Sequence, residues 1–245
     1  MTVRLDILDI VEIVQPIASG MTQPFLCHLD DGQLYAVKGR QALRQGLIAE
    51  VVAGFLGREL GLPIPPFVIG RMPTSLVRHH GDPDVAHAIG DGPVFASAWQ
   101  EPIQPVTPVI LAQQNAALSC WLYVFDHWIA NGDRTLTEHG GNPNLFVRLE
   151  DGALIVIDHN LAFAASYDPA RELPLHAGRP AWDRMRRRDP LRDAMMAGMT
   201  NAARLLPHIF HALPEEWLDG QADFLDTIAT RLRRHDDPRF WAELA

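Results

Sequence analysis

The middle of the chain places the tightest limits on how this protein can fold. An apolar stretch, Val109 to Ile129, predicts a long helix that is buried on nearly every face. A polar loop over 130–143 follows, and two short apolar runs then predict a hairpin with strands Leu145–Leu149 and Leu154–Ile157. The sequence Glu150-Asp151-Gly152 supplies the turn between these strands. The chain must therefore bring a loop and both ends of a hairpin to one end of a buried helix.

Three polar residues stand at the ends of these predicted elements. Asp133 lies in the loop, Asn144 directly precedes the first strand, and Asp158 directly follows the second. Because the strands are antiparallel, we expect Asn144 and Asp158 to lie close together. An amide oxygen and a carboxylate suit a hard cation such as Mg²⁺, and Asp133 can orient a hydroxyl nucleophile and accept its proton. Asn142 competes for the metal position, and we favour Asn144 because the strand begins directly after it.

Other polar residues in this segment also have structural explanations. We expect Asp126 to cap or hydrogen-bond the loop rather than to act in catalysis. Asn131 can equally well satisfy backbone groups of the loop. The histidines His127, His139 and His159 are of a type that is most often structural or exposed.

The first hundred residues are rich in predicted strands. We expect these strands at Val3–Val14, Phe25–Leu29, Leu34–Lys38, Phe67–Ile69 and Val94–Trp99. Apolar residues at three- and four-residue spacing predict a helix over Gln41–Leu60, which Gly61 closes. The abundance of His, Asp, Gly and Pro over 70–93 predicts a loop or a weakly ordered insertion. The Pro-rich stretch 102–108 indicates a linker, and from about Trp182 onward the pattern is helical.

Two features of the N-terminal region indicate phosphate binding. Lys38 ends a short predicted strand, and Glu50 lies twelve residues later within the predicted helix. Kinases use such a pair, in which the ammonium binds the α- and β-phosphates and the carboxylate holds the ammonium. Alone the pair is a weak signal, because surface lysines and glutamates are common. The small-residue loop Ile17–Thr22, with Ser19 and Gly20, can present backbone N–H groups to phosphates or form a plain hairpin loop.

The net charge, the lengths of the apolar runs and the cysteine spacing argue against several classes of protein. The net charge of −9 argues against general nucleic-acid binding, which needs a clustered basic surface. We interpret the basic stretch Arg184–Arg188 as a solvated helix face, with a docking patch for an anionic partner as the alternative. No apolar run reaches the roughly 18 to 20 residues that span a bilayer. Acidic residues interrupt the N-terminal apolar pattern, so we expect neither a membrane span nor a signal peptide. Cys27 and Cys120 lack CxxC spacing, and we expect reduced thiols in a cytoplasmic protein.

Taken together, these motifs resemble the HipA-like branch of the protein kinase-like superfamily and, more distantly, phosphatidylinositol kinases. The resemblance rests on the segments Asn131-Gly132-Asp133-Arg134, Asn142-Pro143-Asn144-Leu145 and Ile157-Asp158-His159. The order Lys, Glu, Asp, Asn, Asp covers residues from about 17 to 163. The predicted C-terminal helices fit the HipA-like group better than the lipid kinases.

The resemblance implies an α+β, bilobal protein kinase-like fold. Its parts would be a β-rich N-lobe with one helix at 1–101, a hinge-proximal linker at 102–108 and a mostly helical C-lobe at 109–245. ATP and Mg²⁺ would be the cofactors. The implied roles are ATP binding for Lys38, Glu50, Ser19, Gly20 and the hinge residues Ala98, Trp99 and Gln100, catalysis for Asp133, and metal binding for Asn144 and Asp158.

Two features depart from the pattern of this family. Asp133 and Asn144 are eleven residues apart, with Thr135–Gly141 inserted where kinases usually have about five residues. Asn160 stands where a glycine commonly follows the metal-binding aspartate and its neighbour. Asparagine tolerates left-handed backbone angles, so the turn at this position can be kept.

Several functions share this set of residues. The resemblance favours a HipA-like Ser/Thr protein kinase, and a small-molecule kinase would use the same core, because fold and site do not fix the acceptor. A metal-dependent phosphohydrolase would use Asp126, His127, Asp133, Asp158 and His159 but leave Lys38 and Glu50 without a role. A nucleotide-binding pseudokinase is the remaining alternative. The expected partner is a protein or small-molecule hydroxyl acceptor, and an antitoxin-type protein is a further candidate.

Overall fold

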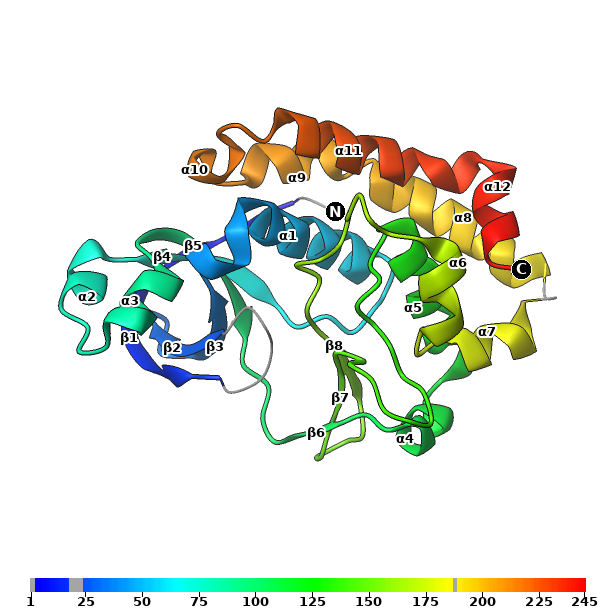
Figure 1. Ribbon diagram of the computed structural model, residues 1–245, viewed down its shortest axis with the longest axis horizontal. Coiled ribbons are helices and arrows are strands. Elements are labelled where there is room, and N and C mark those ends of the chain that lie inside the picture. Colours follow the sequence, from blue (N-terminus) through cyan, green and yellow to red (C-terminus); the bar gives the residue numbers. More distant parts are fainter. Residues whose placement is uncertain (1–2, 18–23, 187–188) are drawn as a thin grey trace.

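The computed structural model describes residues 3–17, 24–186 and 189–245 and shows a mixed α/β chain (Figure 1). Ser19 and Gly20 lie outside the described residues. Five strands form a closed barrel in the order β1-β2-β3-β5-β4, in which β1 runs parallel to β4 and the other neighbours are antiparallel. The strands are β1 (Ile7–Pro16), β2 (Phe25–Leu29), β3 (Leu34–Lys38), β4 (Phe67–Met72) and β5 (Gly92–Ala98).

The hairpin of β2 and β3 is confirmed at the predicted residues. Its turn is closed by a hydrogen bond from the backbone N–H of Leu29 to the carbonyl of Gln33, 3.1 Å long. Gly32 takes a φ of 77°, which a side chain would disfavour, and the Asp31 carboxylate accepts from the N–H of Gln33 at 3.0 Å. The turn fixes the register of the hairpin, and with it the position of Lys38 at the end of β3.

The central helix α1 (Leu43–Glu59) confirms the predicted helix within two residues at its N-terminal end, where the short 3₁₀ turn η1 (Arg40–Ala42) precedes it. It is buried along most of its length between the barrel and the other helices (Figure 1). Glycines permit this close approach: a Cβ on Gly54 would come within 2.5 Å of the Phe67 ring, and one on Gly57 within 3.2 Å of the Phe125 ring. The helix that carries Glu50 is therefore held against both halves of the molecule.

The prediction of a loop or weakly ordered insertion over 70–93 is wrong. The segment contains the end of β4, α2 (Thr74–Arg78), α3 (Pro83–Ile89) and the start of β5. Asp82 caps α3 by accepting from the N–H of Asp84 at 2.9 Å, with Pro83 at the first turn. Val85 and Ile89 then pack into the core of the barrel. The polar composition that suggested a loop consists in part of helix-capping residues.

The predicted single helix over Val109–Ile129 is two helices, α4 (Pro108–Gln113) and α5 (Ala116–Trp128). Gln114 has an extended backbone, and Asn115 starts α5 by accepting from the N–H of Ala117 at 2.9 Å. Only α5 is buried as predicted, since α4 has no buried residue.

The predicted hairpin is confirmed as β7 (Leu145–Arg148) and β8 (Leu154–Val156). The Pro-rich stretch 102–108 contains the strand β6 (Ile103–Pro105), which adds a third strand next to β7. A linker was predicted for this stretch, and the strand was missed because it is only three residues long.

The chain is helical toward its C-terminus, as predicted. The elements are α6 (Pro169–Glu172), η2 (Leu173–Leu175), α7 (Arg179–Met185), α8 (Asp189–Ala203), α9 (Leu206–Ala212), α10 (Glu215–Leu218), α11 (Ala222–Leu232), η3 (Arg233–Asp236) and α12 (Pro238–Glu243). Many of their apolar side chains join those of α1 and α5 in one large core, separate from the core inside the barrel. No helix in the described ranges has the length and apolarity needed to cross a membrane.

Candidate active site

A cavity of about 400 Å³ lies between the barrel and the β6–β8 sheet. Its walls are mostly apolar, with Ala36, Phe95, Ser97 and Trp99 on the barrel side and Leu145 and Val156 on the hairpin side. One end is polar and is lined by Lys38, Glu50, Asn142, Asn144 and Asp158. The cavity thus joins an apolar slot to a cluster of charged and amide groups, which is the form of a site for a ligand with a flat apolar part and an ionic part.

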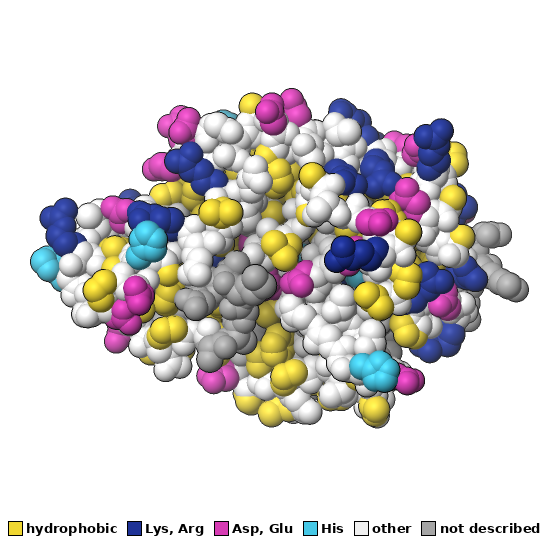
Figure 2. All heavy atoms as spheres, in the orientation of Figure 1, with side chains coloured by type: hydrophobic (Ala, Val, Ile, Leu, Met, Phe, Trp, Pro, Cys, Tyr) yellow, Lys and Arg dark blue, Asp and Glu magenta, His cyan; other side chains and the backbone are white. Residues whose placement is uncertain are grey.

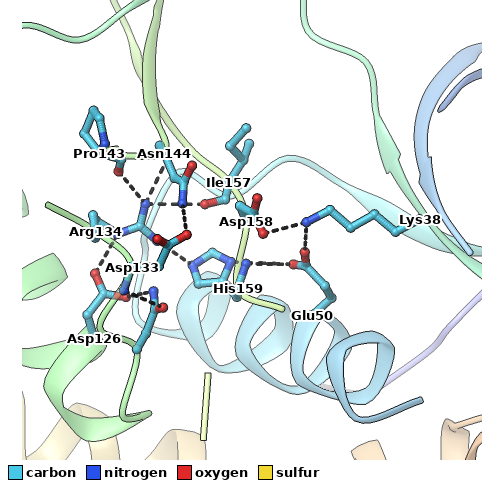
Figure 3. A network of polar contacts seen from close by, with 11 residues as sticks. Lys38, Glu50, Asp126, Asp133, Arg134, Pro143, Asn144, Ile157, Asp158 and His159 are labelled. Atoms are coloured by element: carbon cyan, nitrogen blue, oxygen red, sulfur yellow. Dashed lines mark hydrogen bonds and ion pairs between the residues drawn. The ribbon is translucent and has the colours of Figure 1, made fainter. Parts of the chain in front are cut away.

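Lys38 connects two carboxylates at the polar end of the cavity (Figure 3). Its Nζ lies 2.6 Å from Glu50 Oε1 and 2.6 Å from Asp158 Oδ1, and the lysine side chain is 9% exposed. Burial acts to lower the pKa of Lys38, but the two carboxylates outweigh it, so the pKa lies above its usual value. Lys38 therefore remains a cation, fixed between the helix α1 and the end of the hairpin.

Asp158 is an anion at the junction of these groups. Burial acts to raise its pKa, and the charge and hydrogen bond of Lys38 lower it by more, so the pKa lies below its usual value. The backbone N–H of the next residue, His159, donates to the second oxygen of Glu50 at 3.1 Å. Glu50 therefore binds both the lysine and the backbone beside Asp158, which ties α1 to the hairpin.

Asp133 lies beside this cluster, in the loop after α5. Its Oδ2 accepts from the amide nitrogens of Asn144 at 3.0 Å and Asn142 at 3.2 Å. Burial raises the pKa of Asp133, the hydrogen bond from Asn144 lowers it, and the negative charge of Asp158 raises it again. The net result is a pKa above the usual value. The loop and the hairpin thus bring Asp133, Asn144 and Asp158 together, as the order of elements in the sequence predicts.

Both asparagines remain candidates for a metal ligand, since both line the cavity and both bind Asp133. Their backbones differ. The carbonyl of Asn144 accepts from the N–H of Ile157 at 3.1 Å, so Asn144 is fixed directly across from the residue before Asp158. Asn142 is exposed.

Two of the candidate metal ligands, Asn144 and Asp158, share an unusual backbone conformation. Asn144 has a φ of 48° and Asp158 a φ of 62°, both in the left-handed region. This region costs an L-residue on the order of 1 to 2 kcal/mol, so surrounding contacts must hold each residue there. Asn160 itself does not adopt a left-handed φ, so the left-handed tolerance considered for Asn160 is used by Asp158 instead.

Arg134, whose role the sequence did not indicate, is the centre of the buried polar network (Figure 3). Its side chain is completely buried. The Nε donates to Asp126 Oδ2 at 2.6 Å, the Nη1 lies within 3.3 Å of the carbonyls of Pro143, Asn144 and Ile157, and the Nη2 is 3.2 Å from His159 Nε2.

His159 is neutral in this network. Burial and the adjacent charge of Arg134 lower its pKa to about 3, so Nε2 accepts from the guanidinium.

Asp126 and Asn131 support the loop, and Asp126 is not exposed to the cavity. Asp126 is fully buried and accepts from Asn131 Nδ2 at 2.8 Å, from Arg134 Nε at 2.6 Å and from His176 Nε2 at 2.9 Å. His127 is also fully buried, stacked on Phe240 with ring centroids 4.6 Å apart. In residues 3–17, 24–186 and 189–245 no three His, Cys, Asp or Glu side chains group as metal ligands. The arrangement argues against the phosphohydrolase set that included Asp126 and His127.

Of the three predicted hinge residues, Trp99 lines the cavity, whereas Ala98 and Gln100 do not. The indole N–H of Trp99 is buried with no partner in the described part of the chain. The backbone N–H groups of Ala98 and Trp99 donate to the carbonyls of Pro66 and Leu34 at 2.8 and 2.9 Å. Gln100 Nε2 donates to the carbonyls of Ala98 and Trp99 at 3.3 and 3.2 Å. The backbone N–H groups of Ala98 and Trp99 thus already have hydrogen-bond acceptors within the protein.

Charged side chains on the face shown in Figure 2 are of both signs, with more of the basic ones over the helical half of the molecule. The surface near the helices includes the ion pairs Arg179–Asp183 at 2.9 Å and Arg234–Glu243 at 2.6 Å. Part of the predicted basic stretch, Arg187 and Arg188, lies outside the described residues.

Comparisons with known proteins give a family and a fold. A family model described as HipA-like kinase matches residues 10–244. No curated protein matches the sequence. Among solved structures, the Helicobacter pylori proinflammatory kinase CtkA is similar over 91% of each chain, with 12% sequence identity and a TM-score of 0.53. The Golgi casein kinase with Mn/ADP bound covers 97% of this chain and 74% of its own, with 11% identity and a TM-score of 0.38. At 12% identity the likeness to the Helicobacter kinase shows a shared fold alone.

Proposed function

Because the chain belongs to the HipA-like kinase family, whose model spans residues 10–244, we propose that it transfers the γ-phosphate of Mg·ATP to a hydroxyl group. The observation that carries the proposal is the cluster of Lys38, Glu50 and Asp158 at the polar end of the cavity. The lysine Nζ lies 2.6 Å from a carboxylate oxygen of each acidic residue. A buried lysine held by a helix glutamate is the device that kinases use to bind nucleotide phosphates.

Each part of the site has a role in this proposal. The apolar slot beside Ser97 and Val156 accommodates a nucleobase, and Lys38 binds the phosphates. Asp133 orients the acceptor hydroxyl and accepts its proton, and the raised pKa of this carboxyl favours that step. The amide nitrogens of Asn142 and Asn144 hold the Asp133 carboxylate in one orientation.

Asn144 and Asp158 would hold the divalent cation. The donor set fits, since an amide oxygen and a carboxylate are hard ligands and the residues before and after the hairpin bring them to the same end of the cavity. When bound, the ion offsets the negative charge on the phosphate oxygens. Lys38 lies 2.6 Å from the same Asp158 carboxylate, so a lysine and the ion would share this ligand.

The acceptor within this proposal is a Ser or Thr hydroxyl of a protein, as the resemblance to HipA-like kinases suggests. A small-molecule alcohol is the alternative, because the core residues serve either acceptor. An antitoxin-type protein partner and a cytoplasmic location belong to the same proposal.

Incubation of the protein with γ-labelled ATP and Mg²⁺ tests the proposal directly. Mass spectrometry should detect phosphate on the protein itself, on a protein acceptor or on a small-molecule alcohol from an extract. Comparison of the proteomes of cells with active protein and with an inactive variant would identify the acceptor. If the protein neither binds ATP nor transfers phosphate to any of these, the proposal is wrong.

A Lys38→Met variant should transfer phosphate at least about 10²-fold more slowly, a loss of roughly 2.7 kcal/mol, because the phosphates lose their buried cation. The matched control is Arg40→Met, which removes an exposed cation two residues away that pairs with Asp91. Rates are measured with labelled ATP, and thermal unfolding checks that both variants are folded. If Lys38→Met and an Asp133 variant hydrolyse ATP as fast as the unaltered protein, the activity is that of a phosphohydrolase.

A Ser97→Met variant should bind nucleotide at least about ten-fold more weakly, roughly 1.4 kcal/mol, because the larger side chain fills part of the apolar slot. Ser97 lines the cavity and pairs with Ala36 on β3, so the added atoms have little room elsewhere. Titration calorimetry with ADP measures the affinity. Ser97→Ala is the control and should stay within about three-fold of the unaltered protein. Equal affinity for the Met and Ala variants would place the nucleobase outside this slot.

A further inference from the structure

Arg134 makes contacts that no other side chain of the site duplicates. Its guanidinium is completely buried and binds three parts of the chain: the end of α5 through Asp126, the loop before β7, and the segment after β8 through Ile157 and His159. Arg134 also follows Asp133 directly in the sequence. A single side chain therefore connects the loop that carries Asp133 to both ends of the hairpin (Figure 3).

The three backbone carbonyls that Arg134 binds belong to peptide units next to Asn144 and Asp158, the two residues with left-handed φ angles. The carbonyls of Pro143 and Asn144, at 2.9 and 3.0 Å from Nη1, belong to the peptide units on either side of Asn144. The carbonyl of Ile157, at 3.3 Å, belongs to the peptide unit before Asp158. Holding both peptide planes restrains Asn144 at its φ of 48°. At Asp158, with a φ of 62°, Arg134 holds the plane before the residue and Glu50 binds the N–H of the plane after it.

The other atoms of the guanidinium hold Arg134 itself in place. Asp126 balances its charge at 2.6 Å, and Asp126 is in turn bound by His176 at 2.9 Å. The fork of an arginine can serve several acceptors at once, whereas a lysine ammonium is a single point. The geometry thus requires an arginine in this position and not only a positive charge.

We infer that Arg134 is a positioning residue that holds Asn144 and Asp158 in the conformation needed to bind the divalent cation of a metal–nucleotide complex. The inference rests on the proposed function, in which these two residues are the metal ligands. It assigns to Arg134 an effect on metal affinity that is separate from nucleotide binding in the apolar slot, because Arg134 does not line the cavity.

The test compares the affinity for ADP with and without Mg²⁺ by titration calorimetry, and Mn²⁺ binding by electron paramagnetic resonance. In Arg134→Lys, the affinity for metal-free ADP should stay within about three-fold, whereas the gain in affinity on adding Mg²⁺ should fall at least about ten-fold. The Mg²⁺ concentration for half-maximal transfer should rise in parallel. Arg148→Lys, a partly exposed position on β7, is the matched control and should behave as the unaltered protein.

A second variant covers the case in which Arg134→Lys does not fold. The pair Asp126→Asn with Arg134→Gln replaces the buried ion pair by two neutral amides, and it should show the same loss of the Mg²⁺-dependent gain. If the variants that fold keep the full gain, or lose metal-free ADP binding to the same extent, the inference is wrong. If the unaltered protein itself shows neither a Mg²⁺-dependent gain nor transfer, it is the proposed function that fails.

Discussion

An Asp133→Asn variant should transfer phosphate about 10²- to 10⁴-fold more slowly than the unaltered protein, the range expected when a general base is lost. The amide keeps the shape of the carboxylate but cannot accept the proton of the acceptor hydroxyl. Nucleotide affinity should stay within about three-fold, because Asp133 does not line the cavity. Transfer is measured with γ-labelled ATP, and affinity by titration calorimetry with ADP.

Asp151→Asn, in the turn between β7 and β8, is the matched control for this experiment, since it makes the same chemical change in an exposed carboxylate. Its rate should equal that of the unaltered protein. Full activity in Asp133→Asn would show that the role assigned to Asp133 is wrong. A loss of ADP binding together with activity would indicate instead that the variant has disturbed the loop as a whole.

An Asp126→Asn variant should lower the free energy of unfolding by about 3 to 5 kcal/mol, the cost of removing one partner of a buried ion pair. The change leaves the fully buried guanidinium of Arg134 without a counter-charge and weakens the contact to His176. Urea unfolding measures the difference. The surface pair Arg179–Asp183 offers a control, because Asp183→Asn should cost less than about 1 kcal/mol.

The same ion pair predicts the acid limit of stability. Burial acts to raise the pKa of Asp126, and the charge of Arg134 with the His176 hydrogen bond lowers it by more, so the folded-state pKa lies below the usual value. The stabilisation is therefore fully present above about pH 4 and is lost as the pH falls toward the folded-state pKa.

If Asp126→Asn unfolds like the unaltered protein at pH 7, the ion pair of Asp126 and Arg134 contributes nothing to stability. In the double variant with Arg134→Gln, part of the loss should be recovered, since no buried charge remains unpaired.

The elements that could be predicted from the sequence are those with strong local signals. Turn residues at Asp30–Gly32 and Glu150–Gly152 located two hairpins, and apolar spacing located α1. The helices α2 and α3 were missed because each is short, with five and seven residues, and the apolar pattern has little length to show itself. The break at Asn115 lies in the short polar run Gln113–Asn115 between two apolar runs, and the prediction of one helix passed over it. There the capping side chain of Asn115 decides the boundary.

The candidate site was predictable to the extent that chain order determines it. The ends of an antiparallel hairpin must lie together, so Asn144 and Asp158 follow from the sequence, and the family named from these motifs is confirmed over residues 10–244. Arg134 was part of a motif but had no expected role, because its partners come from three separate segments and only the fold brings them together. His176 could not be found for the same reason, since 50 residues separate it from Asp126.

The buried lysine at the end of the cavity has one more consequence, which concerns chemical labelling. Lys38 is the only lysine in the chain, and the other 20 of the 21 basic Lys and Arg residues are arginines. A nucleotide analogue that acylates amines therefore finds a single lysine side chain, which lies in the cavity wall and reacts after its ammonium has given up a proton. Apart from the terminal amine, each chain can gain one acyl group. The share of intact protein that shows the added mass therefore gives the fraction of molecules whose cavity has held the analogue.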